Sequence, residues 1–194
     1  MAYQYDVFIS YKANEHTNPW VKGFKDKFEF WLMQALGGYK PNIFYSPEKI
    51  DNGMLWEPVL TESLKKSKCI LCLWTPEYFK SEWCVYEWRT FESRWLQLNN
   101  DAIIRAIKLI DEESYHADAR ARQSADFREF IPTVMIENSL NSLQFNNAIM
   151  QLAEDVSASV CEAPDYIDFV VIDFNQTKNM YVQPNIPRRT RITL

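Results

Sequence analysis

Short runs of strand-forming residues alternate with longer stretches of helical periodicity along the first half of the chain. The runs occupy residues 5–11, 42–45 and 69–74, and the third carries no charged residue. After each run, apolar residues recur at intervals of three and four, which predicts helices over 20–36, 56–64 and 81–98. Apolar strands separated by helices are typical of a parallel sheet that is covered on both faces. The pattern therefore predicts an α/β domain.

The second half of the chain continues this pattern less regularly. The elements predicted there are a strand over 102–110, a surface loop with a short helix over 111–128, a strand over 132–136, a helix over 143–160 and a strand over 166–174. The last strand either adds an edge to the sheet or leads to a further domain or a sensor partner. We expect one domain over residues 1–175, followed by a C-terminal arm or linker over 176–194, which has prolines, arginines and no periodicity.

Composition narrows the range of functions. The chain has 194 residues, of which 47% are hydrophobic, so it can bury the core of a single domain. Its net charge of −5 argues against binding to nucleic acids or anionic membranes through their phosphates. The four glycines fit neither the dinucleotide fingerprint nor a P-loop, which excludes Rossmann dehydrogenases and Walker NTPases. With neither a signal peptide nor a membrane-spanning apolar stretch, we expect a cytoplasmic protein.

Histidine and cysteine positions do not indicate a metal or redox site. His16 and His116 are too far apart in sequence for a zinc-binding helix, and neither lies in a recognisable catalytic setting. Cys69 and Cys72 have the spacing of a C-x-x-C pair but lie inside a predicted buried strand. Because residues three apart in a strand point to opposite faces, we expect the two thiols to be separated by the sheet, and we expect no metal.

The predicted helix over 81–98 carries the most informative side chains. Its apolar stripe consists of Cys84, Trp88, Phe91, Trp95 and Leu98. Trp83 and Glu87 each precede a member of this stripe by one residue, so they lie one turn apart on the flank of the buried face. There Trp83 can stack on a ring while Glu87 accepts hydrogen bonds from sugar hydroxyls. The alternative is an ordinary surface ion pair at Glu87 and core packing at Trp83.

The order of these motifs resembles that of the Toll/interleukin-1 receptor (TIR) domain family, especially its bacterial and plant forms. The motifs are YDVFISY at 5–11, the loop 46–56, the apolar strand 69–74 and S-x-W-C-x-x-E at 81–87. The resemblance covers residues 3–110 well and 130–160 loosely. It implies a flavodoxin-like fold, an open parallel sheet of about five strands with helices on both faces. In the bacterial NAD⁺-cleaving branch it also implies cleavage of the bond between nicotinamide and ribose.

The resemblance also implies roles for individual residues. Glu87 stands at the catalytic glutamate of the family, and the residues matching its substrate pocket are Ser10, Tyr11, Lys12, Ser46, Ser81 and Trp83. NAD⁺ is then the substrate, and no cofactor is expected. Since nicotinamide in NAD⁺ is already a cationic leaving group, one carboxylate can stabilise the charge that develops on the ribose. A paired mechanism would need a second carboxylate, for which Asp6, Glu48 and Glu82 are open alternatives.

From the resemblance we expect an NAD⁺ nucleosidase that releases nicotinamide and forms ADP-ribose or a cyclic isomer. Self-association would activate it, because the loop 46–56 of one molecule helps to complete the pocket of the next. The setting implied is bacterial antiphage defence. The first alternative is a non-catalytic module that binds other TIR domains. The second is a nucleoside deoxyribosyltransferase of related topology, which also places a glutamate against a sugar.

Overall fold

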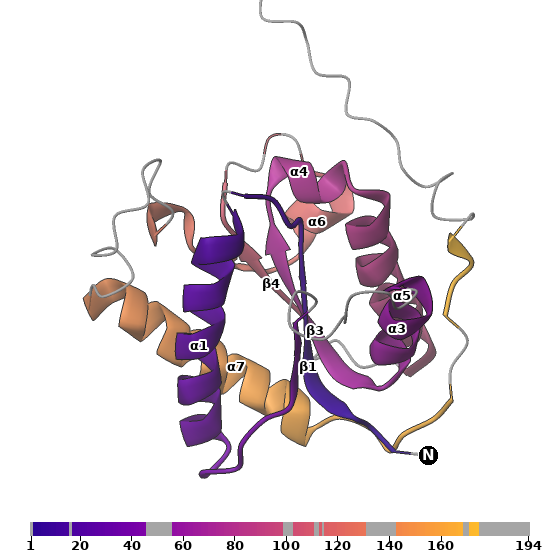
Figure 1. Ribbon diagram of the computed structural model, residues 1–194, viewed down its shortest axis with the longest axis horizontal. Coiled ribbons are helices and arrows are strands. Elements are labelled where there is room, and N and C mark those ends of the chain that lie inside the picture. Colours follow the sequence, from indigo (N-terminus) through magenta and orange to yellow (C-terminus); the bar gives the residue numbers. More distant parts are fainter. Residues whose placement is uncertain are drawn as a thin grey trace, which may run out of the picture.

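The computed structural model describes residues 2–15, 17–45, 56–98, 103–110, 113, 115–130, 143–168 and 171–174. It contains a parallel sheet with the strand order β2-β1-β3-β4-β5 (Figure 1). The strands are β1 (Tyr5–Tyr11), β2 (Ile43–Tyr45), β3 (Ser67–Trp74), β4 (Ile104–Lys108) and β5 (Ala125–Asp126). This is the flavodoxin-like order, and it confirms the predicted fold class.

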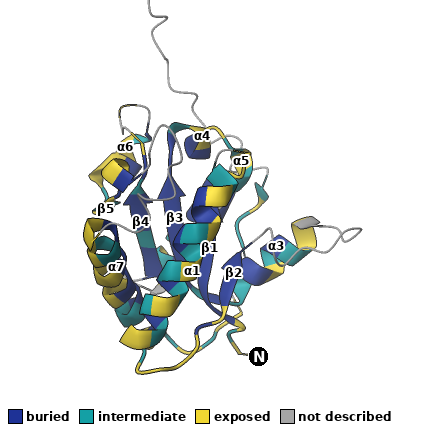
Figure 2. Ribbon diagram, turned by 60° about the vertical axis from the view of Figure 1, so that its left-hand side comes forward, coloured by how far each residue is buried: buried dark blue, intermediate teal, exposed yellow. Residues whose placement is uncertain are grey.

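Helices cover both faces of the sheet, α1 and α7 on one side and α3 and α5 on the other (Figure 1). The helices are α1 (Thr17–Ala35), α3 (Trp56–Lys65), α4 (Pro76–Phe79), α5 (Glu82–Leu98), α6 (Ala117–Ala121) and α7 (Leu143–Cys161). A short 3₁₀ helix, η3 (Arg128–Phe130), follows β5. Strands β1, β2 and β3 are buried between the two helical layers, whose outer surfaces are exposed, whereas β5 at the edge is partly exposed (Figure 2). No helix within the described ranges is long and apolar enough to cross a membrane.

Alternation along the central strands divides the apolar core into two halves. Val7 faces the half formed with α1 and α7, and Phe8 faces the half formed with α3 and α5. Cys69 and Cys72 likewise lie in different halves, which confirms that the sheet separates them. Burial raises the pKa of each thiol to about 12, so both remain neutral near pH 7.

The predicted loop between β3 and α5 contains the short helix α4. Thr75 caps this helix, since its hydroxyl oxygen accepts a hydrogen bond from the backbone N–H of Tyr78 at 3.1 Å. Pro76 stands in the first turn, where its missing N–H leaves no bond unmade. A helix of four residues is too short to produce a periodic pattern, so the sequence analysis missed it.

The periphery of the sheet differs from the prediction. The short helix expected within 111–128 is confirmed as α6, but β5 also lies in that segment. The strand predicted over 132–136 and the arm predicted over 176–194 lie outside the described residues. The strand predicted over 166–174 is wrong, because residues 166–168 and 171–174 form no strand. Instead Val171, Ile172 and Phe174 pack against the half of the core that includes α5, and this packing outweighs their strand propensity.

Candidate functional site

Glu87 lies on the inner side of α5 and is 7% exposed. Its Oε2 atom accepts a hydrogen bond of 2.5 Å from the hydroxyl of Ser10, which is buried near the carboxyl end of β1. The same hydroxyl lies 2.8 Å from that of Tyr78 on α4. Because Ser10 has one proton and donates it to Glu87, the hydroxyl of Tyr78 donates to Ser10. Strand β1 and two helices thus hold the Glu87 carboxyl group through a chain of hydroxyls.

The carboxyl group of Glu87 is desolvated, and among the described residues no cation is found paired with it. Burial raises the pKa of Glu87 to about 8, and the hydrogen bond from Ser10 opposes this rise only in part. Among the described ion pairs, none involves Glu87. Because Glu87 is buried rather than on a solvated face, the alternative of an ordinary surface ion pair is wrong. Trp83 does pack against the core half that includes α5, as that alternative expected. A buried carboxyl group with a strongly raised pKa is typical of functional sites.

A cleft of about 180 Å³ opens beside Glu87 at the carboxyl end of β1. Its lining residues are Phe8, Ile9, Tyr11, Lys12, Ala13, Leu60, Ser81, Trp83, Cys84 and Glu87. Five of the predicted site residues therefore line this cleft, and a sixth, Ser10, donates a hydrogen bond to the carboxyl group of Glu87. Ser46 lies outside the described residues. Clefts that enclose a whole ligand of moderate size measure about 300–1,000 Å³, so this one accommodates only part of a dinucleotide.

Two groups that favour anions lie at the cleft, the side chain of Lys12 and the N-terminus of α5. Lys12 is exposed there, and Ser81 immediately precedes α5, where its hydroxyl oxygen accepts a hydrogen bond of 3.5 Å from the Cys84 N–H. The first turn of a helix carries partial positive charge and favours anions. The cleft therefore offers a cation and a helix N-terminus at its mouth and a single carboxyl group farther in.

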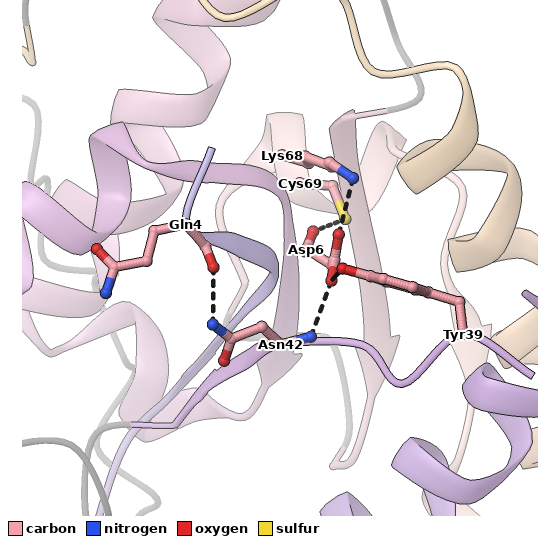
Figure 3. Close-up of polar contacts among 6 residues, drawn as sticks. All are labelled: Gln4, Asp6, Tyr39, Asn42, Lys68 and Cys69. Atoms are coloured by element: carbon pink, nitrogen blue, oxygen red, sulfur yellow. Dashed lines mark hydrogen bonds and ion pairs between the residues drawn. The ribbon is translucent and has the colours of Figure 1, made fainter. Parts of the chain in front are cut away.

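The other carboxylates considered from the sequence do not line this cleft. Asp6 lies near the amino end of β1, where it binds Lys68, Asn42 and Tyr39 (Figure 3). Glu82 is exposed on the first turn of α5, and Glu48 lies outside the described residues. Of the described residues that line the cleft, Glu87 is the only acidic one. The geometry thus favours chemistry with one carboxylate.

Tyr78 is the site residue that the sequence analysis missed. It is fully buried, and burial raises the pKa of its hydroxyl well above the ordinary value, so the hydroxyl stays protonated and can donate. The signal that could have found it is Thr75-Pro76, a cap followed by proline, which marks the start of a helix directly after β3. Such a helix places Tyr78 over the carboxyl ends of the central strands.

Metal chemistry finds no support in the part of the chain that the structure describes. Among the described residues, no group of three or more His, Cys, Asp or Glu side chains could hold a metal ion. His116 is half-buried against Phe79 and Trp88 rather than in the cleft. What the site can do is accept hydrogen bonds from hydroxyls at Glu87 and stabilise positive charge on a bound ring.

The chain belongs to the TIR domain family, because the family profile described as "TIR domain" matches residues 7–133. This range includes β2 to β5, most of β1 and every described residue that lines the cleft. Among solved structures, the chain is similar to the TIR domains of the activated Roq1 resistosome directly recognizing the pathogen effector XopQ. That similarity has 16% sequence identity and a TM-score of 0.43, covering 82% of this chain and 96% of that chain. No curated protein matches the chain.

Proposed function

We propose that this TIR domain is an NAD⁺ nucleosidase and that Glu87 is its catalytic residue. The observation that carries the proposal is a desolvated carboxyl group that accepts a hydrogen bond from the Ser10 hydroxyl and lines a cleft together with an indole. The other groups of the cleft suit a nucleotide, since Lys12 and the first turn of α5 match the charge of a pyrophosphate. Trp83 offers a surface for the nicotinamide ring.

The reaction requires little acid–base chemistry. Nicotinamide leaves NAD⁺ as a neutral molecule when its bond to C1′ of the ribose breaks, so no general acid has to protonate it. Positive charge then develops on the ribose, and the carboxylate of Glu87 stabilises it while accepting hydrogen bonds from the ribose hydroxyls. Attack on C1′ by water, which loses a proton to the solvent, gives ADP-ribose, and attack by a nucleophile of the same molecule gives a cyclic isomer. Ser10 holds the carboxylate in place during both steps.

The raised pKa of Glu87 links ionisation to substrate binding. With a pKa of about 8, the carboxyl group of the free protein is mostly protonated at pH 7. A bound nicotinamide cation favours the ionised form, because opposite charges at short range lower the pKa of an acid. The substrate thus supplies a positive charge that no described residue is seen to place against Glu87. We expect kcat/KM to rise with pH and to level off above about pH 8.

The size of the cleft supports activation by self-association. A volume of about 180 Å³ holds a nicotinamide riboside portion but not the adenosine half of NAD⁺. We propose that the adenosine half lies over the mouth near Lys12 and that residues 46–56 of a second molecule cover it. The biological role that we propose is antiphage defence in bacteria, through depletion of NAD⁺ or release of a nucleotide signal.

The test is the release of nicotinamide from NAD⁺ by concentrated or crowded protein, analysed by chromatography. We expect turnover by the wild-type chain and a loss of at least about 100-fold in Glu87→Ala, as for removal of a group that stabilises transition-state charge. Circular dichroism shows whether the variant is folded. Absence of turnover under every assembling condition would leave a non-catalytic interaction module. Base exchange on free deoxynucleosides, with NAD⁺ untouched, would indicate a deoxyribosyltransferase.

A further inference from the structure

The segment that follows α7 crosses from one helical layer to the other. It leaves the end of α7, passes the N-terminus of the chain and continues beside α5 (Figure 1). On its way the ring of Tyr166 meets that of Tyr3 edge to face at 5.3 Å. Val171, Ile172 and Phe174 then pack against the core half that includes α5. The segment therefore reaches the helix that carries Glu87.

Phe174 contacts the aromatic side chain at the edge of the cleft. Its ring stacks on the indole of Trp83, with centroids 4.1 Å apart and planes inclined by 21°. Tyr86 completes the group, with its ring edge-on to Trp83 at 5.5 Å and to Phe174 at 5.4 Å. Three rings from two distant parts of the sequence thus form one cluster at the edge of the core half that includes α5.

The two stacked rings have different relations to the cleft. Trp83 is one of the residues that line it, together with Glu87, whereas Phe174 is not among the described lining residues. Phe174 therefore covers part of the indole without occupying the space beside Glu87. Trp83 stands in the first turn of α5 and is only partly buried, so part of its indole is accessible from the cleft that it lines. The stack with Phe174 restricts the plane of the indole.

We propose that Phe174 is a positioning residue for NAD⁺ binding, which acts by holding the indole of Trp83 parallel to the incoming nicotinamide ring. The inference rests on the proposed function and adds to it a residue outside the range 7–133 that matches the family. When the indole is already held in one orientation, substrate binding loses less entropy, because the indole does not have to be ordered at that moment. Loss of Phe174 therefore weakens substrate binding and leaves the chemical step at Glu87 intact.

The test compares Phe174→Leu, which keeps an apolar side chain but loses the flat ring, with wild type. We expect KM for NAD⁺ to rise about three- to tenfold while kcat stays within about twofold, the pattern for loss of uniform binding. Phe174→Tyr, which keeps the ring, should restore the wild-type KM. Val171→Ala is the matched control, since it shortens a side chain of the same segment without touching the ring stack, and its KM should not change.

A double variant separates positioning from general stability. In a Trp83→Ala background, Phe174→Leu should change KM no further, because the group on which it acts is gone. The ¹H–¹⁵N resonance of the Trp83 indole, assigned by its loss in Trp83→Phe, should shift in Phe174→Leu. This readout needs no turnover. Melting curves show whether each variant is folded. If Phe174→Leu melts at a much lower temperature than wild type, Phe174→Met takes its place in the test.

Several results would overturn the inference. An unchanged KM in folded Phe174→Leu would show that the stack does not position Trp83, and an equal rise in KM in the Trp83→Ala background would show a structural role. Increased turnover in Phe174→Leu would show that the segment competes with the substrate. In each of these cases wild-type turnover still supports the nucleosidase. A wild-type chain that never releases nicotinamide would refute the nucleosidase and this role together.

Discussion

Two buried carboxyl groups lie toward opposite ends of the central sheet, and they differ in their hydrogen-bond and ion-pair partners. Asp6, near the amino end of β1, is 3% exposed, and Glu87, at the carboxyl end, is 7% exposed. Asp6 Oδ1 lies 2.8 Å from Lys68 Nζ, and its Oδ2 accepts hydrogen bonds from the Asn42 N–H at 2.8 Å and the Tyr39 hydroxyl at 3.2 Å (Figure 3). Glu87 has the hydroxyl of Ser10.

The comparison separates a carboxylate that is paired with a cation from the carboxyl group for which we propose a function. Removing either group from water costs free energy, and only at Asp6 do a cation and two further donors offset this cost. These contacts connect β1 with β3 through Lys68 and with the start of β2 through Asn42. At Glu87 the hydrogen bond from Ser10 offsets only part of the free-energy cost of desolvation. Such a stability sacrifice is expected where a carboxylate must remain available to a ligand.

The largest contrast should appear in the pH dependence of stability of Glu87→Gln. A carboxyl group whose pKa rises from 4.5 in the unfolded chain to about 8 in the folded state makes folding less favourable as the pH rises through this interval. The amide does not ionise, so the variant escapes this loss. At pH 9 we expect Glu87→Gln to be more stable than wild type by about 2–4 kcal/mol. Urea unfolding at pH 5 and pH 9 measures the difference.

At pH 5 the same two proteins should have nearly equal free energies of unfolding, because Glu87 is then protonated in wild type. The other carboxylates titrate alike in both proteins and cancel. A variant that is less stable than wild type at both pH values would contradict the uncompensated state of Glu87.

The same change from carboxyl to amide should have the opposite sign at Asp6. Asp6→Asn loses the ion pair with Lys68 and the charge on the hydrogen bond from Asn42, so we expect a loss of about 1–3 kcal/mol in the free energy of unfolding. The nicotinamide release of the folded variant should stay within about twofold of wild type, since Asp6 lies outside the cleft. A variant that folds stably but no longer turns over NAD⁺ would give Asp6 a role in the site.

A smaller effect is expected from Ser10→Ala. Because the bond from Ser10 lowers the pKa of Glu87, its loss should raise this pKa further and move the acid limb of the rate profile to higher pH. At pH 7 we expect kcat/KM to fall about tenfold, in line with a hydrogen bond to a charged group. Profiles between pH 6 and pH 9.5 give the shift. Tyr78→Phe keeps the hydrogen bond from Ser10 to Glu87, so its kcat/KM at pH 7 should fall only about threefold. Identical profiles for Ser10→Ala and wild type would exclude this role of Ser10.

Sequence patterns predicted the central layers well and the edges of the site less well. The apolar runs that became β1 and β3 have buried neighbours on both faces, so their composition alone indicates a central strand. The stripe on α5 correctly placed Cys84, Trp88 and Phe91 in the core and Glu87 at its edge. The local pattern of apolar residues thus predicts directly which side chains of these elements are buried.

Contacts between distant segments left no local signal. Tyr78 reaches Ser10 only because β1 and β3 are neighbours in the sheet, and Phe174 reaches Trp83 only because the chain crosses between layers. The strand propensity of residues 166–174 was misleading, since apolar packing on α5 satisfies the same side chains without a strand partner. The motifs therefore pointed to Glu87, Ser10 and Trp83 as site residues, but the contacts of Tyr78 with Ser10 and of Phe174 with Trp83 could not be predicted from the sequence.

Titration of the Glu87 carboxyl group tests the central claim most directly. Protein carrying ¹³C at the glutamate carboxyl carbon shows this group in its NMR spectrum, and comparison with Glu87→Gln assigns the resonance. The account predicts a midpoint near pH 8 in the free protein. A midpoint near pH 4.5, the ordinary value for glutamate, would show a solvated or paired carboxylate and contradict the account.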